Sequence, residues 1–316
     1  RNKFFIGLCL LLAACNADKP EMDVRLHACA AMPSARASAT CFVVNGQAYV
    51  FGGRSGTDST RLNDLWKYDA STDSWDSIGE APMLPRVNAT ACVHQGKVYL
   101  GLGFNGKYKQ DSTYLRDWWE YTPGTPGSWK RLADYPNSYT DDATAFVGDG
   151  ELYVGYGFCW NYRRDMFRYN IEKDQWDSID VEVGMHEYPL RSFGGTGCTC
   201  NGRHFMGTGF YRFSLDWWAE FDGKHWHERT PVPGKTRTLA ASAATEQYIY
   251  VTGGTHYGGV NTTGEVLADI RRYAPQTDHW TYVAVLPEGL INHVCFTIGK
   301  RVYIGLGETS DWQIND

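Results

Sequence analysis

Four arginines recur just before short apolar segments rich in small residues, and they suggest a site for an anion. A guanidinium group binds planar anions such as carboxylate, sulfate or phosphate through paired N–H donors. If the four groups converge, they form a ring that suits such an anion. The alternative is that each arginine packs against a neighbouring unit and pairs with an acidic residue there. The four are Arg36, Arg86, Arg191 and Arg237.

The segments near these arginines carry aromatic and acid–base side chains. Exposed aromatic rings beside hydrogen-bonding groups suit sugars and suit protein partners equally well, although ordinary solvated loops also contain such residues. The further candidate ligand-binding residues are Tyr108, Trp160, Tyr162, Tyr188, Tyr211 and Tyr257. The candidate catalytic residues, which would move protons as general acid or base, are His186, Glu187, His293 and Glu308.

An aspartate directly before a short aromatic or aliphatic segment recurs at intervals of about 50 residues, so one structural unit repeats along the chain. A catalytic group is rarely needed once in every unit. We therefore expect these aspartates to be structural, each accepting backbone hydrogen bonds where a strand begins. They are Asp64, Asp117, Asp165, Asp216, Asp269 and Asp311.

Each unit also has a glycine pair or near pair before the aspartate, and all but the last have an aromatic residue and then a tryptophan after it. Alternating apolar runs separated by Gly, Asn and Asp predict about four strands per unit. This order resembles the kelch repeat, from about residue 25 to the C-terminus. The resemblance implies a β-propeller, in which four-stranded blades surround a central channel. It also implies that the loops between strands two and three share a face with the links between blades, where function usually lies.

We expect an all-β fold, a six-bladed kelch β-propeller with four-stranded antiparallel blades, over residues 23–316. The last unit stops early, and Leu26 precedes Pro33 by the spacing that separates Trp75 from Pro82. We therefore predict that residues 24–32 pair with the C-terminal strand and close the ring, because an open propeller would expose unpaired strand edges.

The first residues have the form of an export signal. Basic residues 1 and 3 precede an apolar run, and Leu12-Ala13-Ala14-Cys15 follows. A cysteine after Leu-Ala-Ala resembles a bacterial lipobox and implies lipidation of Cys15; the alternative is an ordinary signal with an incidental cysteine. We expect a lipoprotein signal peptide over residues 1–14 and a lipidated tether over residues 15–22. The protein would then be exported to the bacterial cell envelope, as a periplasmic or outer-membrane lipoprotein attached to the membrane only through its lipid.

Composition excludes several classes of function. A net charge of -6 and the lack of any long basic run argue against nucleic-acid binding. Cys198-Thr199-Cys200 is too short for a zinc knuckle, so we predict no metal site and no cofactor. Cys41, Cys92, Cys198 and Cys295 are expected to be small buried residues of inner strands. Copper enzymes of the galactose-oxidase type also use kelch propellers, but with seven blades and an extra ligand-bearing domain, so we do not expect that chemistry here.

Two functional hypotheses follow. The first is a binding module, a cell-envelope protein whose loop face holds a glycan, an anionic sugar or a protein partner. The second is an enzyme similar to the sialate mutarotases, which are exported bacterial kelch proteins that interconvert the anomers of N-acetylneuraminate. Mutarotation needs a general acid and base near the anomeric carbon and an anchor for the carboxylate. This similarity lies in fold, location and size, and it assigns no catalytic position.

Overall fold

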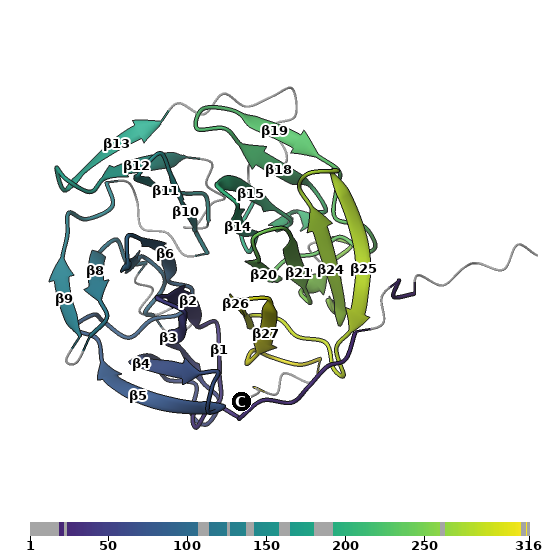
Figure 1. Cartoon of the computed structure of the whole chain (residues 1–316), viewed down its shortest axis with the longest axis horizontal. Coiled ribbons are helices and arrows are strands. Elements are labelled where there is room, and N and C mark those ends of the chain that lie inside the picture. Colours follow the sequence, from purple (N-terminus) through teal and green to yellow (C-terminus); the bar gives the residue numbers. More distant parts are fainter. Residues whose placement is uncertain are drawn as a thin grey trace, which may run out of the picture.

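The computed structural model describes residues 19–21, 24–106, 114–124, 127–136, 142–157, 165–179, 192–259, 263–310 and 314. The protein is a β-propeller, as predicted: antiparallel sheets stand like blades around a central axis (Figure 1). Within each sheet the strands follow one another from the inside outwards in chain order. None of the described residues forms a helix long and apolar enough to cross a membrane.

Five blades contain four principal strands each. Blade 1 has β1 (Arg36–Ala37), β2 (Thr40–Val44), β3 (Gln47–Ser55), β4 (Arg61–Asp69) and β5 (Ser74–Glu80). Blade 2 has β6 (Thr90–His94), β7 (Lys97–Gly101), β8 (Trp118–Thr122) and β9 (Ser128–Arg131), and blade 3 has β10 (Thr144–Gly148), β11 (Glu151–Gly155), β12 (Met166–Asn170) and β13 (Gln175–Ile179). Blade 4 has β14 (Thr196–Cys200), β15 (Arg203–Gly207), β18 (Trp218–Phe221) and β19 (Trp226–Arg229), and blade 5 has β20 (Ala241–Ala244), β21 (Ile249–Thr252), β24 (Asp269–Ala274) and β25 (His279–Val285). Short pairs extend the loops of blades 4 and 5: β16 (Phe210–Tyr211) with β17 (Phe213–Ser214), and β22 (Thr255–His256) with β23 (Glu265–Val266).

The sixth unit forms a sheet of two strands, β26 (Val294–Ile298) and β27 (Arg301–Gly305). The described residues therefore contain five complete blades, and the prediction of six is corrected to five and a two-stranded sixth sheet. Its predicted third strand lies outside the described residues except for Ile314, which bridges to Glu308. The predicted closing strand is not seen, because residues 24–32 have no strand pairing.

The sixth sheet nevertheless contacts blade 1 in the way that other neighbouring sheets contact each other. The N–H of Gly307 donates to the carbonyl of Arg36 at 2.9 Å, as Gly53 of blade 1 donates to Arg86 of blade 2 at 2.8 Å. The recurring glycines allow this close approach. At Gly253 of blade 5, which has φ +55°, an added Cβ would lie 2.4 Å from the carbonyl oxygen of Leu290 of the sixth sheet, so only glycine fits.

A chain of backbone hydrogen bonds runs around the channel where the inner strands begin. In each sheet one residue there has a positive φ, and in blades 1, 2 and 5 and in the sixth sheet the N–H of that residue donates to the carbonyl of the equivalent residue in the preceding sheet. These bonds measure 2.7–3.3 Å and join blade 4 to blade 5, blade 5 to the sixth sheet, the sixth sheet to blade 1 and blade 1 to blade 2. We call these residues the channel belt; they are Ser38, Asn88, Asp142, Gly194, Leu239 and Asn292.

The outer strands of a blade hold the link that arrives from the preceding sheet. In blade 3, Trp176 Nε1 donates to the carbonyl of Ala133 at 2.9 Å. The N–H of Ala133 donates to Asp174, which also accepts the hydroxyl of Tyr169. Ala30 is held in the same way in blade 1, so the N-terminal segment occupies the place of an incoming link. The outer-strand tryptophans Trp75 and Trp176 thus bind these links through their indole N–H groups.

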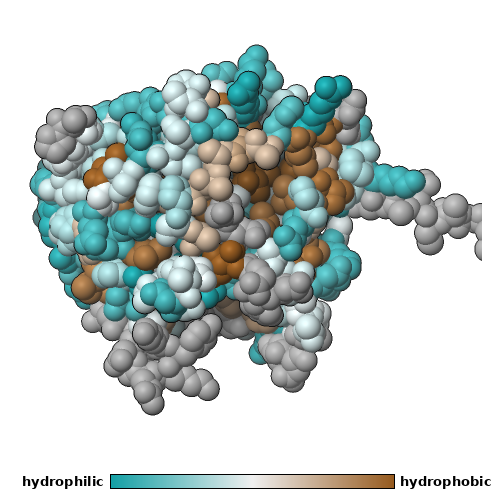
Figure 2. Space-filling view, turned by 90° about the horizontal axis from the view of Figure 1, so that it is seen from below, coloured by the Kyte–Doolittle hydropathy of each residue, from teal (hydrophilic) through white to brown (hydrophobic). Residues whose placement is uncertain are grey.

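The side of the molecule that Figure 2 shows from below exposes apolar side chains, which gather in one area between hydrophilic surfaces. Strand β27 is at most partly buried along its length. In contrast β7, β11 and β15, which hold the same place in blades 2 to 4, are buried from their second residue onward. The second strand of the sixth sheet is thus less covered than its counterparts in blades 2 to 4.

Candidate functional site

Three of the four predicted arginines lie in the described residues, and each forms an ion pair inside its own blade. Nη1 and Nη2 of Arg86 donate to the two carboxylate oxygens of Asp117 at 2.7 and 2.8 Å. Nη1 also donates to the carbonyl of Leu102, and Nε donates to the carbonyl of Leu84. The Arg86 side chain has no exposed surface. Arg36 with Asp64 and Arg237 with Asp269 repeat this two-bond pairing.

These pairs change the interpretation of both residue types. Because their guanidinium groups are buried and paired with aspartates, Arg36, Arg86 and Arg237 form no ring that is open to the channel. The aspartates were predicted to accept hydrogen bonds from the backbone. Asp64, Asp117 and Asp269 instead accept them from arginine side chains. Burial alone would raise the pKa of Asp117, but the hydrogen bonds and charge of Arg86 hold that pKa below its ordinary value. Each pair therefore fastens the start of an inner strand to the third strand of its blade.

Blade 4 departs from this pattern. The pairing of β15 with β18 places Trp217, not Asp216, where Asp117 stands in blade 2. Trp217 Nε1 donates to the carbonyl of Thr208 at 2.7 Å, which is the position of the Leu102 carbonyl bound by Arg86. The predicted equivalence of Asp216 with the other aspartates is therefore wrong by one residue.

The same shift affects the fourth arginine. The pairing of β14 with β15 places Ser192 at the position that Arg86 holds in blade 2, so Arg191 is not the equivalent residue. Arg191 itself lies outside the described residues. Several other candidates also lie outside them: Cys15, Tyr108, Trp160, Tyr162, His186, Glu187 and Tyr188.

A polar cavity of about 140 Å³ opens where the inner strands begin, and we call it the channel mouth. All six sheets line it. Each contributes its channel-belt residue and the residue that follows, and in five sheets the second of these is alanine or glycine. The following residues are Ala39, Ala89, Ala143, Gly195, Ala240 and His293.

His293 brings the one imidazole to this lining. Its side chain is buried, with 6% of the residue surface exposed. Nε2 lies 2.8 Å from Thr252 Oγ1, while Nδ1 has no hydrogen-bond partner. Burial lowers the pKa of His293 to about 4, so the imidazole is neutral at physiological pH.

This burial predicts a pH-dependent stability. The unfolded chain has an ordinary imidazole pKa near 6.5, so between about pH 6.5 and 4 it binds more protons than the folded chain, and the free energy of unfolding falls as pH falls. The loss contributed by His293 is at most about 3 kcal/mol and is complete below about pH 4. Urea unfolding at about pH 7, 5.5 and 4 should show a weaker pH dependence for His293→Ala than for the wild type. Parallel profiles for the two proteins would contradict the assignment.

Glu308 is almost fully buried, and its backbone bridges to Ile291, two residues before His293. Its carboxylate pairs with Arg54 Nη2 at 2.7 Å and accepts a 3.3 Å hydrogen bond from the Asn292 amide. Arg54 comes from blade 1, so this ion pair joins blade 1 to the sixth sheet. Glu308 is thus placed on the loop face near the channel mouth, with one oxygen held by two partners.

The two described tyrosine candidates lie on adjoining loops of blades 4 and 5. Tyr257 packs against Phe210 with ring centroids 5.9 Å apart, and its N–H donates to Ser214 Oγ at 2.8 Å. Tyr211 lies under the guanidinium group of Arg212. Both tyrosines are half-buried, and neither lines the channel mouth.

Sequence reasoning missed Arg54 and the polar belt residues. The belt could have been found, because Ser, Asn, Asp and Gly, which tolerate positive φ, recur two residues after the arginine position in five of the six units. Arg54 had no such signal, since no other unit has an arginine directly after its glycine pair.

A family model described as "KLHDC2/KLHL20/DRC7 Kelch-repeats domain" matches residues 16–209. The chain belongs to the kelch-repeat family. Kelch-like protein 15 of Danio rerio is 25% identical over 257 residues, which cover 71% of this chain and 39% of that protein. N-acetylneuraminate epimerase of Shigella sonnei is 31% identical over 126 residues, which cover 38% of this chain and 33% of the epimerase. The chain thus matches less than half the length of these relatives.

A solved structure, "Structure of YjhT", superposes on this kelch propeller with a TM-score of 0.75. It covers 91% of this chain and 95% of the other, at 17% sequence identity. At that identity the likeness concerns the fold alone.

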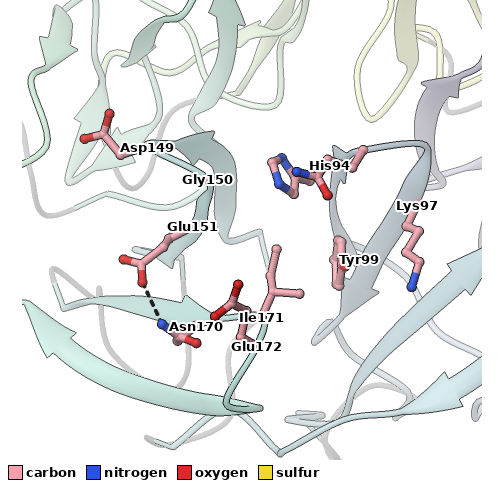
Figure 3. A pocket seen from close by; sticks show the side chains of 10 residues that line it. His94, Lys97, Tyr99, Asp149, Gly150, Glu151, Asn170, Ile171 and Glu172 are labelled. Carbon is pink, nitrogen blue, oxygen red and sulfur yellow. Dashed lines mark hydrogen bonds between the residues drawn. The ribbon is translucent and has the colours of Figure 1, made fainter.

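A second cavity, of about 470 Å³, lies on the opposite face of the kelch propeller between the hairpin turns of blades 2 and 3 (Figure 3). Four of its polar side chains bind each other or an adjacent residue. Asn170 donates to Glu151, and Lys97 pairs with Glu120 just outside the lining. No buried polar atom of this lining lacks a partner. Among the described residues no group of His, Cys, Asp and Glu side chains could hold a metal ion. The channel mouth, with its unpaired imidazole nitrogen, is therefore the stronger candidate.

Proposed function

We propose that this kelch propeller binds a sugar-type ligand at the channel mouth of its loop face. The observation that carries the proposal is the cavity to which all six sheets contribute, lined by hydroxyl, amide, carboxylate and imidazole groups. Ligand sites combine a concave surface with a few convergent polar groups, and sugar hydroxyls need both donors and acceptors. The half-buried Tyr211 and Tyr257, on adjoining loops of blades 4 and 5, would supply surfaces for the C–H faces of a sugar ring.

The similarity to N-acetylneuraminate epimerases suggests the first ligand to test. The paired arginines argue against an anion-binding ring, so a carboxylate of the ligand would have to reach other groups, such as the partly exposed Arg54. A protein partner remains the alternative occupant of the same face, in keeping with the similarity to a kelch-like protein.

Saturation-transfer NMR of residues 19–316 with N-acetylneuraminate tests the proposal directly. Transfer of saturation from the protein to the sugar protons, lost when an excess of a competing sugar is added, would support a sugar site. No transfer with this sugar or with its methyl ester would refute it, and a search for a protein partner by pull-down would follow.

A second candidate function is catalysis of anomer exchange in N-acetylneuraminate. The specific observation in its favour is the epimerase similarity, together with His293 and Glu308 lying near one another on the sixth sheet. A general acid and base at the anomeric carbon are the minimal requirement. Exchange spectroscopy on the same sample decides: cross-peaks between anomers that grow with protein concentration support an enzyme, whereas an unchanged exchange rate with bound sugar leaves a binding protein.

We propose further that the protein is exported and anchored through a lipid on Cys15. The support is the sequence pattern around that residue. In a bacterial host, the wild type should label with palmitate and sediment with membranes, and Cys15→Ser should do neither. Membrane sedimentation of Cys15→Ser would contradict the lipid anchor.

We also propose that the N-terminal segment completes the sixth blade. Its support is the position of Ala30, which is held like an incoming link, and the poor cover of β27. Hydrogen exchange tests it, because paired outer-strand amides exchange slowly. Amides of residues 25–29 that exchange at the rate of an unfolded peptide would contradict closure.

A further inference from the structure

One residue of the channel mouth differs in type from the residues at the same position in the other five sheets. Alanine or glycine follows the belt residue in five sheets, and His293 follows it in the sixth. The fold therefore does not require a large or polar side chain at this position. A buried ring nitrogen without a partner costs stability, so its presence needs a reason outside the fold.

The surrounding hydrogen bonds assign the role of that nitrogen. Thr252 has a single hydroxyl proton, which it donates to the carbonyl of Ala241 at 3.3 Å. Thr252 Oγ1 lies 2.8 Å from His293 Nε2, and both contacts of Thr252 are hydrogen bonds only when Nε2–H donates to Oγ1; we therefore assign the proton of the neutral ring to Nε2. Nδ1 is left with a lone pair and no partner, so its role is that of an acceptor.

The charge near the floor of the cavity determines which ligand group can enter. Arg36, Arg86 and Arg237 are paired with aspartates, and the belt N–H groups that form the backbone chain are bonded to carbonyl oxygens. A carboxylate buried at this floor would meet a lone pair on His293 and no cation among the described residues. Burying an unpaired charge is far more costly than burying a hydroxyl that has an acceptor.

We propose that His293 Nδ1 accepts a hydrogen bond from an uncharged O–H or amide N–H group of the ligand, and so makes the channel mouth select a hydroxyl or acetamido end over a carboxylate. This inference rests on the proposed sugar-binding function. It makes His293 a specificity-determining residue, and it leaves any carboxylate of the ligand to face the loops.

Three substitutions at this position separate a hydrogen bond from mere space filling. Asn places a polar atom near the position of Nδ1, Gln places one near Nε2, and Ala reproduces what other blades carry. Affinities for N-acetylneuraminate and for its methyl ester are measured by titration. His94→Ala, on the opposite face, is the matched control.

We expect His293→Ala and His293→Gln to weaken binding of both sugars about tenfold, and His293→Asn to retain most of it. Melting temperatures should be no lower for His293→Ala, because the ring position tolerates alanine. Equal affinity of the wild type and His293→Ala would overturn the inference and leave the sugar site intact. A loss confined to the acid, with the ester unaffected, would also overturn it. If the wild type binds neither sugar, the proposed function fails and this inference fails with it.

Discussion

Replacing Arg86 with alanine is expected to lower the free energy of unfolding by about 3 to 5 kcal/mol. The change removes the two-bond partner of Asp117, whose side chain is only 15% exposed, and leaves that carboxylate without its compensating charge. It also frees the carbonyls of Leu84 and Leu102, which Arg86 holds. Arg86→Lys should fail to restore stability, because an ammonium group cannot make the planar paired contact. Urea unfolding monitored by tryptophan fluorescence measures the loss.

The matched control is an exposed ion pair. Lys235 and Glu265 form a salt bridge with side chains 52% and 56% exposed, so Lys235→Ala should change stability by less than about 1 kcal/mol. A double variant, Arg86→Met with Asp117→Leu, should be more stable than Arg86→Ala because it leaves no unpaired buried charge. Equal unfolding curves for Arg86→Ala and the wild type would mean that the pair is not structural and would reopen an anion-binding role.

Replacing Gly207 with alanine should be still more damaging, by more than about 4 kcal/mol, or should prevent folding. An added Cβ would lie 2.1 Å from the carbonyl oxygen of Trp217 and 2.6 Å from Cε3 of Trp218. The first obstacle is backbone on the paired strand, so no rotamer change relieves it, and the two strands would have to separate. Thermal unfolding followed by circular dichroism tests this.

Gly259→Ala controls for the change of residue type. No atom lies within 4 Å of a Cβ built at Gly259, and its φ is not positive, so the variant should melt like the wild type. A normally folded Gly207→Ala with an unchanged melting temperature would show that β15 and β18 can move apart without cost.

The repeat could be predicted because it is carried by residue types at fixed places: glycines where sheets approach closely, tyrosine and tryptophan on outer strands, and an acid before the third strand. The partners of those residues could not be predicted, because pairing depends on strand register. A shift of one residue is invisible where several candidates adjoin, as with Asp216 beside Trp217 in blade 4. The same ambiguity made Arg191 resemble Arg86, although Ser192 holds that position.

The candidate site, too, could be predicted from the sequence only in part. His293 and Glu308 could be placed near the loop face from the repeat alone, yet the reason to prefer His293 is a comparison across blades. Aligning the six inner strands by their pairing sets His293 against Ala39, Ala89, Ala143, Gly195 and Ala240. The role of the arginines could be determined only from the structure. An anion-binding ring and a set of buried Arg–Asp pairs would both use arginine at the same spacing in the sequence.

The channel belt has a consequence for how such a protein can diversify. Its bonds use only main-chain atoms, and they demand of each member a backbone shape and not a particular side chain. Serine, asparagine, aspartate, glycine and even leucine occupy the six places. Substitutions there can therefore alter what the opening recognises while the ring keeps its connections, so mutation can explore new ligands at one end of the channel with little risk to folding.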